Sequence, residues 1–184
     1  FLPSVSKIYE KPKARVIVLA STHTGEEEMI LDNLNLKEND LLIIAPRHPE
    51  RFTEVEKIAG DYAKKHDFSF AKFSQTYKFE AKVNLLDTLG ELVNVYAISD
   101  IVVLGGSFVP NIGGHNPIEC AQFNPVMISA EVIFNQKALF SLVENIHIAK
   151  ASEIGSIIDS DAKKSKIAVQ ASADAIIEDI RSTL

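Results

Sequence analysis

Residues 105–119 read GGSFVPNIGGHNPIE and directly follow the apolar run Ile101–Leu104. This order predicts a strand, a glycine-rich loop and the start of a helix. In an α/β sheet such a loop binds anions, because its glycines let the backbone approach a ligand and the first N–H groups of the helix face it. The stretch therefore predicts a site for a nucleotide or a sugar phosphate.

The start of the expected helix is well specified. Asn116 suits the N-cap, Pro117 suits the first helical position, and Glu119 stands where a capping-box carboxylate stands. Glu119 has two interpretations. It either accepts a hydrogen bond from the Asn116 N–H and caps its own helix, or it turns outward and accepts from both hydroxyls of a ribose. The two Gly-Gly pairs upstream count for the second interpretation, since a helix that needs only a cap does not need them.

Composition limits the classes of protein to consider. With 184 residues, 46% of them hydrophobic and 24% charged, the chain fits one globular domain. The net charge of −6 argues against nucleic acid as the main partner, and no apolar run approaches the roughly 20 residues of a membrane span. The single Cys120 fits a reducing compartment. The chain begins without an initiator Met or a secretory signal, so we expect a piece of a longer protein.

Apolar runs alternate with amphipathic stretches along the chain. This alternation predicts an α/β fold, namely a Rossmann-like, mostly parallel sheet with helices on both faces. Strands are expected at residues 15–20, 41–45, 68–73, 82–86, 101–104, 126–129 and 147–149. Helices are expected at residues 26–34, 50–66, 89–98 and 135–143. Further helices are expected to begin at residues 116 and 152, and a last one to run from residue 161 to the end.

The loops that follow parallel strands meet at one edge of the sheet, so separate motifs converge there. Arg47 directly follows its strand, and we interpret it either as a phosphate ligand or as a solvated surface residue. His23, His48 and His115 share this edge. They lack the spacing of metal ligands, and no metal site is expected.

Four blocks resemble one known family. They are residues 21–26 (STHTGE), 46–51 (PRHPER), 87–92 (DTLGEL) together with Tyr96, and 105–119. In this order they resemble the carboxyl-terminal half of the 3-deoxy-D-manno-octulosonic acid (Kdo) transferases of lipopolysaccharide synthesis. The combination is specific, and it covers most of residues 15–135.

The resemblance implies a GT-B glycosyltransferase, in which two Rossmann-like domains face each other and the carboxyl-terminal one holds the donor. Residues 1–184 would then be a single nucleotide-sugar-binding domain, without the amino-terminal acceptor domain. The implied donor is CMP-Kdo and the implied acceptor is a lipid A precursor. Transfer is expected to invert the anomeric centre without a metal or other cofactor. The full protein would work on the cytoplasmic side of the bacterial inner membrane and contact it through the other half, while this domain is soluble.

The resemblance also implies the site residues. Pro46 and Arg47 would line one wall of the CMP site, and residues 89–91 would form its second wall. Residues 116–119 would hold the ribose and phosphate. Arg47 and the N–H groups of Ser107 and Asn116 would stabilise the leaving CMP. The family's general base is a carboxylate of the amino-terminal half, so no catalytic residue is assigned to this chain. The full expected set is Pro46, Arg47, Leu89, Gly90, Glu91, Ser107, Asn116, Pro117, Ile118 and Glu119.

Two alternatives remain open from the sequence. Another GT-B enzyme could use a UDP-sugar, since the fold recurs with many donors. A noncatalytic nucleotide-binding domain would need only the glycine loop and the helix start. The gathering of Arg47, Glu91, Asn116 and Glu119 on one predicted edge argues against it.

Overall fold

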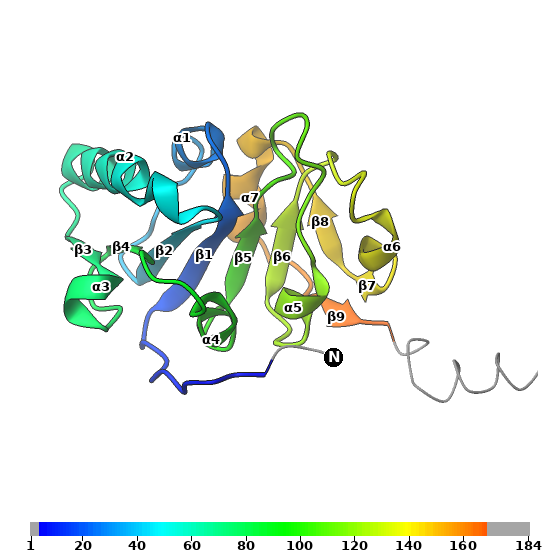
Figure 1. Cartoon of the computed structure of the whole chain (residues 1–184), viewed down its shortest axis with the longest axis horizontal. Helices are drawn as coiled ribbons and strands as arrows, with labels where there is room; N and C mark the ends of the chain where they lie inside the picture. The colour runs from blue at the N-terminus through cyan, green and yellow to red at the C-terminus, as the bar shows by residue number, and fades with distance from the viewer. Residues whose placement is uncertain (1–3, 169–184) are drawn as a thin grey trace, which may run out of the picture.

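A seven-stranded sheet forms the centre of the computed structural model, which describes residues 4–168. The strand order is β3-β4-β2-β1-β5-β6-β8, and all neighbours in it are parallel, as Figure 1 shows. The strands are β1 (Arg15–Thr22), β2 (Asp40–Pro46), β3 (Phe70–Lys72), β4 (Val83–Leu85), β5 (Ile101–Leu104), β6 (Val126–Ser129) and β8 (Ile146–Ile148). The predicted parallel α/β sheet is confirmed.

Helices cover both faces of the sheet because its central strands are apolar on both sides. In β1, Ile17 and Leu19 belong to one buried cluster, whereas Val16 and Val18 belong to the other. The first cluster is completed by α1 (Glu26–Leu31), α2 (Phe52–Lys65) and α7 (Ile154–Ile158). The second is completed by α3 (Phe73–Thr76), α4 (Leu92–Tyr96), α5 (Ile118–Ala121) and α6 (Lys137–Phe140). Short 3₁₀ turns, η1 (Pro49–Arg51) and η2 (Ala151–Glu153), precede α2 and α7.

The carboxyl-terminal part differs from the prediction. Residues 161–168 form no helix; instead β9 (Lys166–Ile167) pairs antiparallel with β7 (Val143–Glu144). The segment is held by long-range contacts, since the N–H and the hydroxyl of Ser165 both donate to Pro125 O at 2.8 Å. Local periodicity carries no information on such contacts. The rest of the predicted last helix lies outside the described residues.

None of the helices within residues 4–168 is long and apolar enough to cross a membrane.

Candidate functional site

The chain leaves the centre of the sheet in two directions. After β1 it continues to β2 on one side, and after β5 it continues to β6 on the other. In open α/β sheets, ligands bind outside the carboxyl ends of the strands at such a switch point. Residues 21–26 and 105–119, two of the blocks singled out above, follow these two strands.

Ser21 marks the end of the regular part of β1. It has left-handed backbone conformation (φ 54°), and the pairing of β1 with β2 is shifted between Ala20 and Thr22. This conformation is costly for a residue other than glycine and is often retained at functional sites. The Ser21 side chain lies beside Tyr96 of α4 and acts to lower the pKa of Tyr96, but burial dominates and raises it well above its ordinary value. Tyr96 thus brings α4 to the switch point.

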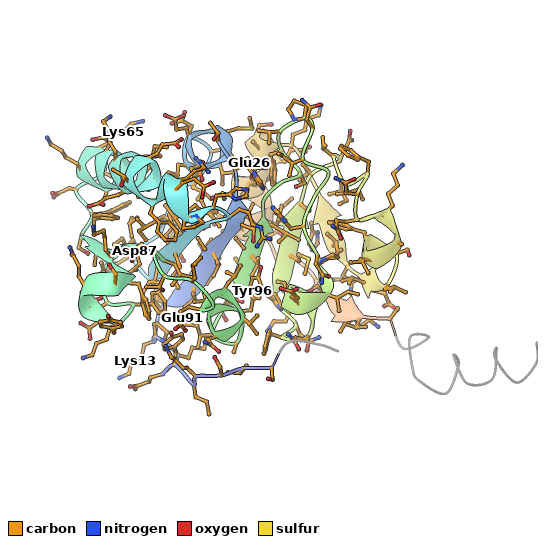
Figure 2. All side chains as sticks on the ribbon, viewed as in Figure 1. Lys13, Glu26, Lys65, Asp87, Glu91 and Tyr96 are labelled. Atoms are coloured by element: carbon orange, nitrogen blue, oxygen red, sulfur yellow. The ribbon has the colours of Figure 1, made fainter. Side chains whose placement is uncertain are left out.

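Glu26 joins the loops that follow β1 and β5. Its side chain is fully buried at the start of α1, where Figure 2 labels it. Oε2 accepts hydrogen bonds from the N–H groups of His23 (2.9 Å) and Gly106 (2.8 Å), and Oε1 accepts from the N–H of Phe108 (3.0 Å). Burial raises the pKa of Glu26, while the three N–H bonds act in the opposite direction. Glu26 was absent from the expected site residues.

These bonds correct part of the prediction for the glycine-rich loop. The N–H groups of Gly106 and Phe108 are used by Glu26, and the N–H of Gly114 donates to Gly106 O at 2.8 Å. They do not face a ligand. The N–H groups of Ser107 and Asn116 have no hydrogen-bond partner within the part of the chain that the structure describes. Those two were the N–H groups expected to stabilise the leaving CMP.

A glycine is needed at position 106 because the ring of His115 approaches the main chain closely there. The φ of Gly106 is +73°, and a Cβ atom built on it would lie 2.8 Å from the ring of His115. A larger residue would be strained in its backbone and would displace the imidazole. The glycine therefore lets His115 lie across the loop, toward the end of β1.

A pocket of about 100 Å³ brings together four of the predicted residues: Pro46, Arg47, Leu89 and Gly90. Ser21 lines it as well. The Arg47 side chain is exposed and has no hydrogen bond or ion pair with any residue between 4 and 168. Its positive charge is therefore available to a ligand.

The Glu91 carboxylate turns to another part of the chain. Oε1 accepts from Lys7 Nζ, and Oε2 accepts from Tyr9 Oη (2.5 Å) and Asn94 Nδ2 (2.8 Å). Burial alone would raise the pKa of Glu91, but the hydrogen bonds from Lys7, Tyr9 and Asn94 lower it. Both oxygens are thus used within the protein. Glu91 itself does not line the pocket, whose wall on this side consists of Leu89, Gly90 and Leu92.

The Ser107 hydroxyl points into the protein. Its Oγ donates to Leu104 O (3.1 Å) and accepts from Ser129 Oγ (3.0 Å) and from the N–H of Ala130 (2.9 Å). The residue is 1% exposed. Any contact of Ser107 with a ligand is limited to its backbone.

The α5 helix begins at Ile118, one residue after the expected first position, Pro117. The N-cap position therefore falls on Pro117 and not on the expected Asn116. Asn116 lies one residue before the cap, and its Oδ1 accepts from the Ile118 N–H at 3.0 Å. Glu119 accepts from the Asn116 side-chain amide at 3.3 Å, not from the Asn116 N–H of the predicted capping box. The second Glu119 carboxylate oxygen has no hydrogen-bond partner among residues 4–168, and the contact with a ribose stays a prediction.

Arg51 forms a buried ion pair behind the site. Its guanidinium binds Glu27 through two parallel contacts, of 2.7 Å and 2.9 Å, and also contacts Glu54 at 2.9 Å. Glu27 is 0% and Arg51 is 8% exposed. The pair fixes η1 against α1. Sequence reasoning did not separate this structural arginine from Arg47, because both follow β2 closely and only the fold shows which is buried.

The three histidines of the edge lie together. His23 Nε2 and His115 Nε2 are 2.8 Å apart, and the ring of His48 packs edge-on against His23 with centroids 5.2 Å apart. No group of three or more His, Cys, Asp or Glu side chains that could hold a metal occurs among residues 4–168.

The Rossmann-like sheet with this loop edge is the architecture of the carboxyl-terminal half of a GT-B glycosyltransferase. One solved structure with this fold is the C-terminal CMP-Kdo binding domain of WaaA from Acinetobacter baumannii, with a TM-score of 0.68 and 29% identity over 79% of this chain and 78% of that one. No protein-family model matches the chain. Curated relatives named 3-deoxy-D-manno-octulosonic acid transferase include one from Haemophilus influenzae, 37% identical over 149 residues, and one from Aquifex aeolicus, 41% identical over 113 residues.

The chain belongs to the family of 3-deoxy-D-manno-octulosonic acid transferases. The matches cover 78% and 59% of this chain but 33% and 30% of the two relatives. The chain therefore spans about a third of the length of the relatives it matches. The resemblance noted in the four blocks is confirmed, whereas the roles of the individual site residues stay predictions.

Proposed function

We propose that the chain, residues 1–184, is the donor-binding domain of a glycosyltransferase that moves Kdo from CMP-Kdo to a lipid A precursor. The transfer inverts the anomeric centre and uses no metal. Another part of the enzyme would bind the acceptor and supply the general base. That part would also contact the cytoplasmic side of the inner membrane. The related domain from Acinetobacter baumannii is described as CMP-Kdo binding, and relatives of this chain are named as transferases.

The observation that carries the proposal is the pocket between the loops after β2 and β4. Pro46 and Arg47 line it from the loop after β2, and Leu89 and Gly90 line it from the loop after β4, which supports the two walls expected of a CMP site. The guanidinium of Arg47 is exposed and lines this pocket, and we expect it to pair with the phosphate. The pocket also borders Ser21, at the switch point of the sheet.

In this function the chain stabilises the leaving group. As the bond between the anomeric carbon of the sugar and the phosphate oxygen breaks, negative charge grows on CMP. Arg47 would bind this charge, and the unpaired N–H groups of Ser107 and Asn116 would donate to it. The orientation of the Ser107 N–H is fixed before the reaction, because Glu26 holds the N–H groups of both its neighbours, Gly106 and Phe108.

Nucleotide binding tests the proposal directly. Calorimetry with CMP, UMP, UDP and AMP on this chain is expected to give the highest affinity for CMP. Arg47→Ala should weaken CMP binding by about tenfold to a hundredfold, the range of a charged hydrogen bond. Lys57→Ala, on the exposed face of α2, is the matched control.

Each other outcome has a distinct meaning. Equal affinity for CMP and UMP would refute the cytidine donor, and preference for UDP would favour a UDP-sugar enzyme. CMP binding that is unaffected by Arg47→Ala would move the site away from this pocket.

A further inference from the structure

Three imidazoles converge at the switch point from three different loops. His23 follows β1, His48 follows β2 and His115 lies in the long loop after β5. The rings of His23 and His115 are nearly parallel, at 10°, with centroids 5.0 Å apart and the two Nε2 atoms 2.8 Å apart. The main chain of Ser21 lies beside the ring of His115 and acts to raise its pKa. The proposed function gives these three histidines no role.

The geometry of the pair determines how many protons it can hold. Two Nε2 atoms at 2.8 Å share one proton, so one ring donates and the other accepts. The accepting ring, when neutral, already has its proton on Nδ1. A further proton can therefore be added only to Nδ1 of the donating ring. The pair remains joined and then has a single positive charge.

Within residues 4–168, both carboxylates that act on the pair are already used inside the protein. The charged side chains around the pair are Arg47, Arg51, Glu26, Glu27 and, when protonated, His48. His48 in turn faces the exposed carboxylate of Glu50, with Nδ1 and Oε1 3.8 Å apart. Of the two carboxylates, Glu26 is bound by three N–H groups and Glu27 by the guanidinium of Arg51. Arg47 has no ion-pair partner among residues 4–168.

These surroundings keep the pair neutral. Burial lowers the pKa of His115 to about 4, and His23, Arg47 and His48 add to this effect. Burial and the charges of His48, Arg51 and Arg47 likewise lower the pKa of His23, whereas Glu27 acts in the opposite direction. An anion beside the rings would reverse these effects, because an opposite charge favours the protonated imidazole.

We propose that His23 and His115, together with Arg47, form an anion subsite that takes up one proton from solvent when an oxyanion of the donor binds. The inference rests on the proposed function. The subsite adjoins the nucleotide pocket, since Arg47 and Ser21 line that pocket, Ser21 lies beside His115, and the charge of Arg47 acts on both rings. The oxyanion is either the phosphate of CMP or the carboxylate of the sugar acid, and the probes below distinguish them.

Proton-linked binding is the expected result. Binding is measured by calorimetry between pH 5.5 and 7.5, in buffers of different ionisation enthalpy, with inorganic phosphate, with CMP, and with CMP plus free Kdo. Uptake of one proton strengthens binding by up to about tenfold for each unit that the pH falls. Uptake with phosphate and CMP would identify the phosphate as the ligand. Uptake only after Kdo is added would identify the sugar carboxylate.

Variants distinguish proton uptake by the imidazoles from proton uptake by the nucleotide. CMP itself gains a proton near pH 6, but this contribution is the same for every variant. His23→Gln and His115→Gln should lose the uptake, whereas His66→Gln, an exposed histidine at the end of α2, should retain it. Imidazole NMR titration of the wild-type chain gives the same information if a variant folds poorly, because both histidines should protonate at higher pH with the probe present.

Uptake that is unchanged in both variants, or absent with all three probes, would overturn the inference. Neither result would affect a preference for CMP over UMP. Conversely, loss of that preference would refute the proposed function, and the inorganic phosphate series would still test the anion subsite.

Discussion

The carboxylate of Glu26 accepts a 2.8 Å hydrogen bond from the main-chain N–H of Gly106, eighty positions further along the chain. The same side chain accepts from His23 and Phe108, so a single buried residue holds the loops after β1 and β5 in register. The glycine-rich loop is thus organised from within the protein by a fixed anion. This arrangement orients the loop before any ligand binds.

Glu26→Gln is expected to destabilise the domain by about 1–3 kcal/mol, the cost of leaving buried N–H groups without an acceptor. Glutamine retains one oxygen, but its NH₂ group must face either Phe108 N–H or the pair from His23 and Gly106. Urea unfolding measures the change. Glu28→Gln, an exposed neighbour on the same helix, is the control, and equal stability of the two variants would contradict this role of Glu26.

The fold was predictable because its information is local. The central strands are continuous apolar runs, so β5 and β6 were placed at their observed bounds, and the alternation with helices determined a parallel sheet. The prediction of a helix at residues 161–168 was wrong because the conformation of this segment is not determined locally. Its conformation depends on Pro125 and Val143, which are distant in sequence.

The two arginines after β2 have different expected effects. Arg51→Ala leaves the fully buried Glu27 without its two guanidinium contacts, and we expect a loss of about 3–5 kcal/mol in the free energy of unfolding. Arg47→Ala removes an exposed side chain and should change stability by less than about 0.5 kcal/mol. Thermal unfolding of both variants checks the contrast. Similar melting temperatures would show that the Arg51–Glu27 pair does not hold the domain together.

The convergence of the candidate residues was predictable, but the direction of each side chain was not. Sequence reasoning placed Pro46, Arg47, Leu89 and Gly90 at one edge because the ends of parallel strands converge, and these residues do share a pocket. It could not show that the carboxylate of Glu91 is used by residues 7 and 9, far away in sequence. An acid directly before a helix is compatible with a ligand, a cap or a distant partner.

Tyr9→Phe tests that distant contact. Figure 1 shows the segment before β1 running along the lower edge of the view, past α4, and Figure 2 labels Glu91 in this region. Phenylalanine retains the ring contacts with Phe73 and Phe79 but cannot donate to Glu91. We expect a loss of about 1.5–3 kcal/mol in stability, the range for a hydrogen bond to a charged group.

The CMP affinity of Tyr9→Phe should fall together with its stability, because Glu91 anchors the wall formed by Leu89 and Gly90. Tyr77→Phe is the control, because Tyr77 is 68% exposed. Calorimetry and urea unfolding of both variants give the two readouts. Stability that falls while CMP affinity stays the same would mean that the contact holds the amino-terminal segment but not the pocket.

Glu119→Gln distinguishes the two interpretations of that residue. Glutamine can still accept from the Asn116 amide, the single bond that Glu119 makes through its carboxylate within residues 4–168, so stability should barely change. If Glu119 accepts from both ribose hydroxyls, glutamine replaces one acceptor with a donor. CMP affinity should then fall by about 1.5–3 kcal/mol, and the wild-type chain should prefer CMP to 2′-deoxy-CMP. Glu131→Gln, an exposed residue after β6, is the control. Unchanged CMP affinity, together with equal binding of the ribo and deoxy forms, would leave Glu119 as part of the helix cap alone.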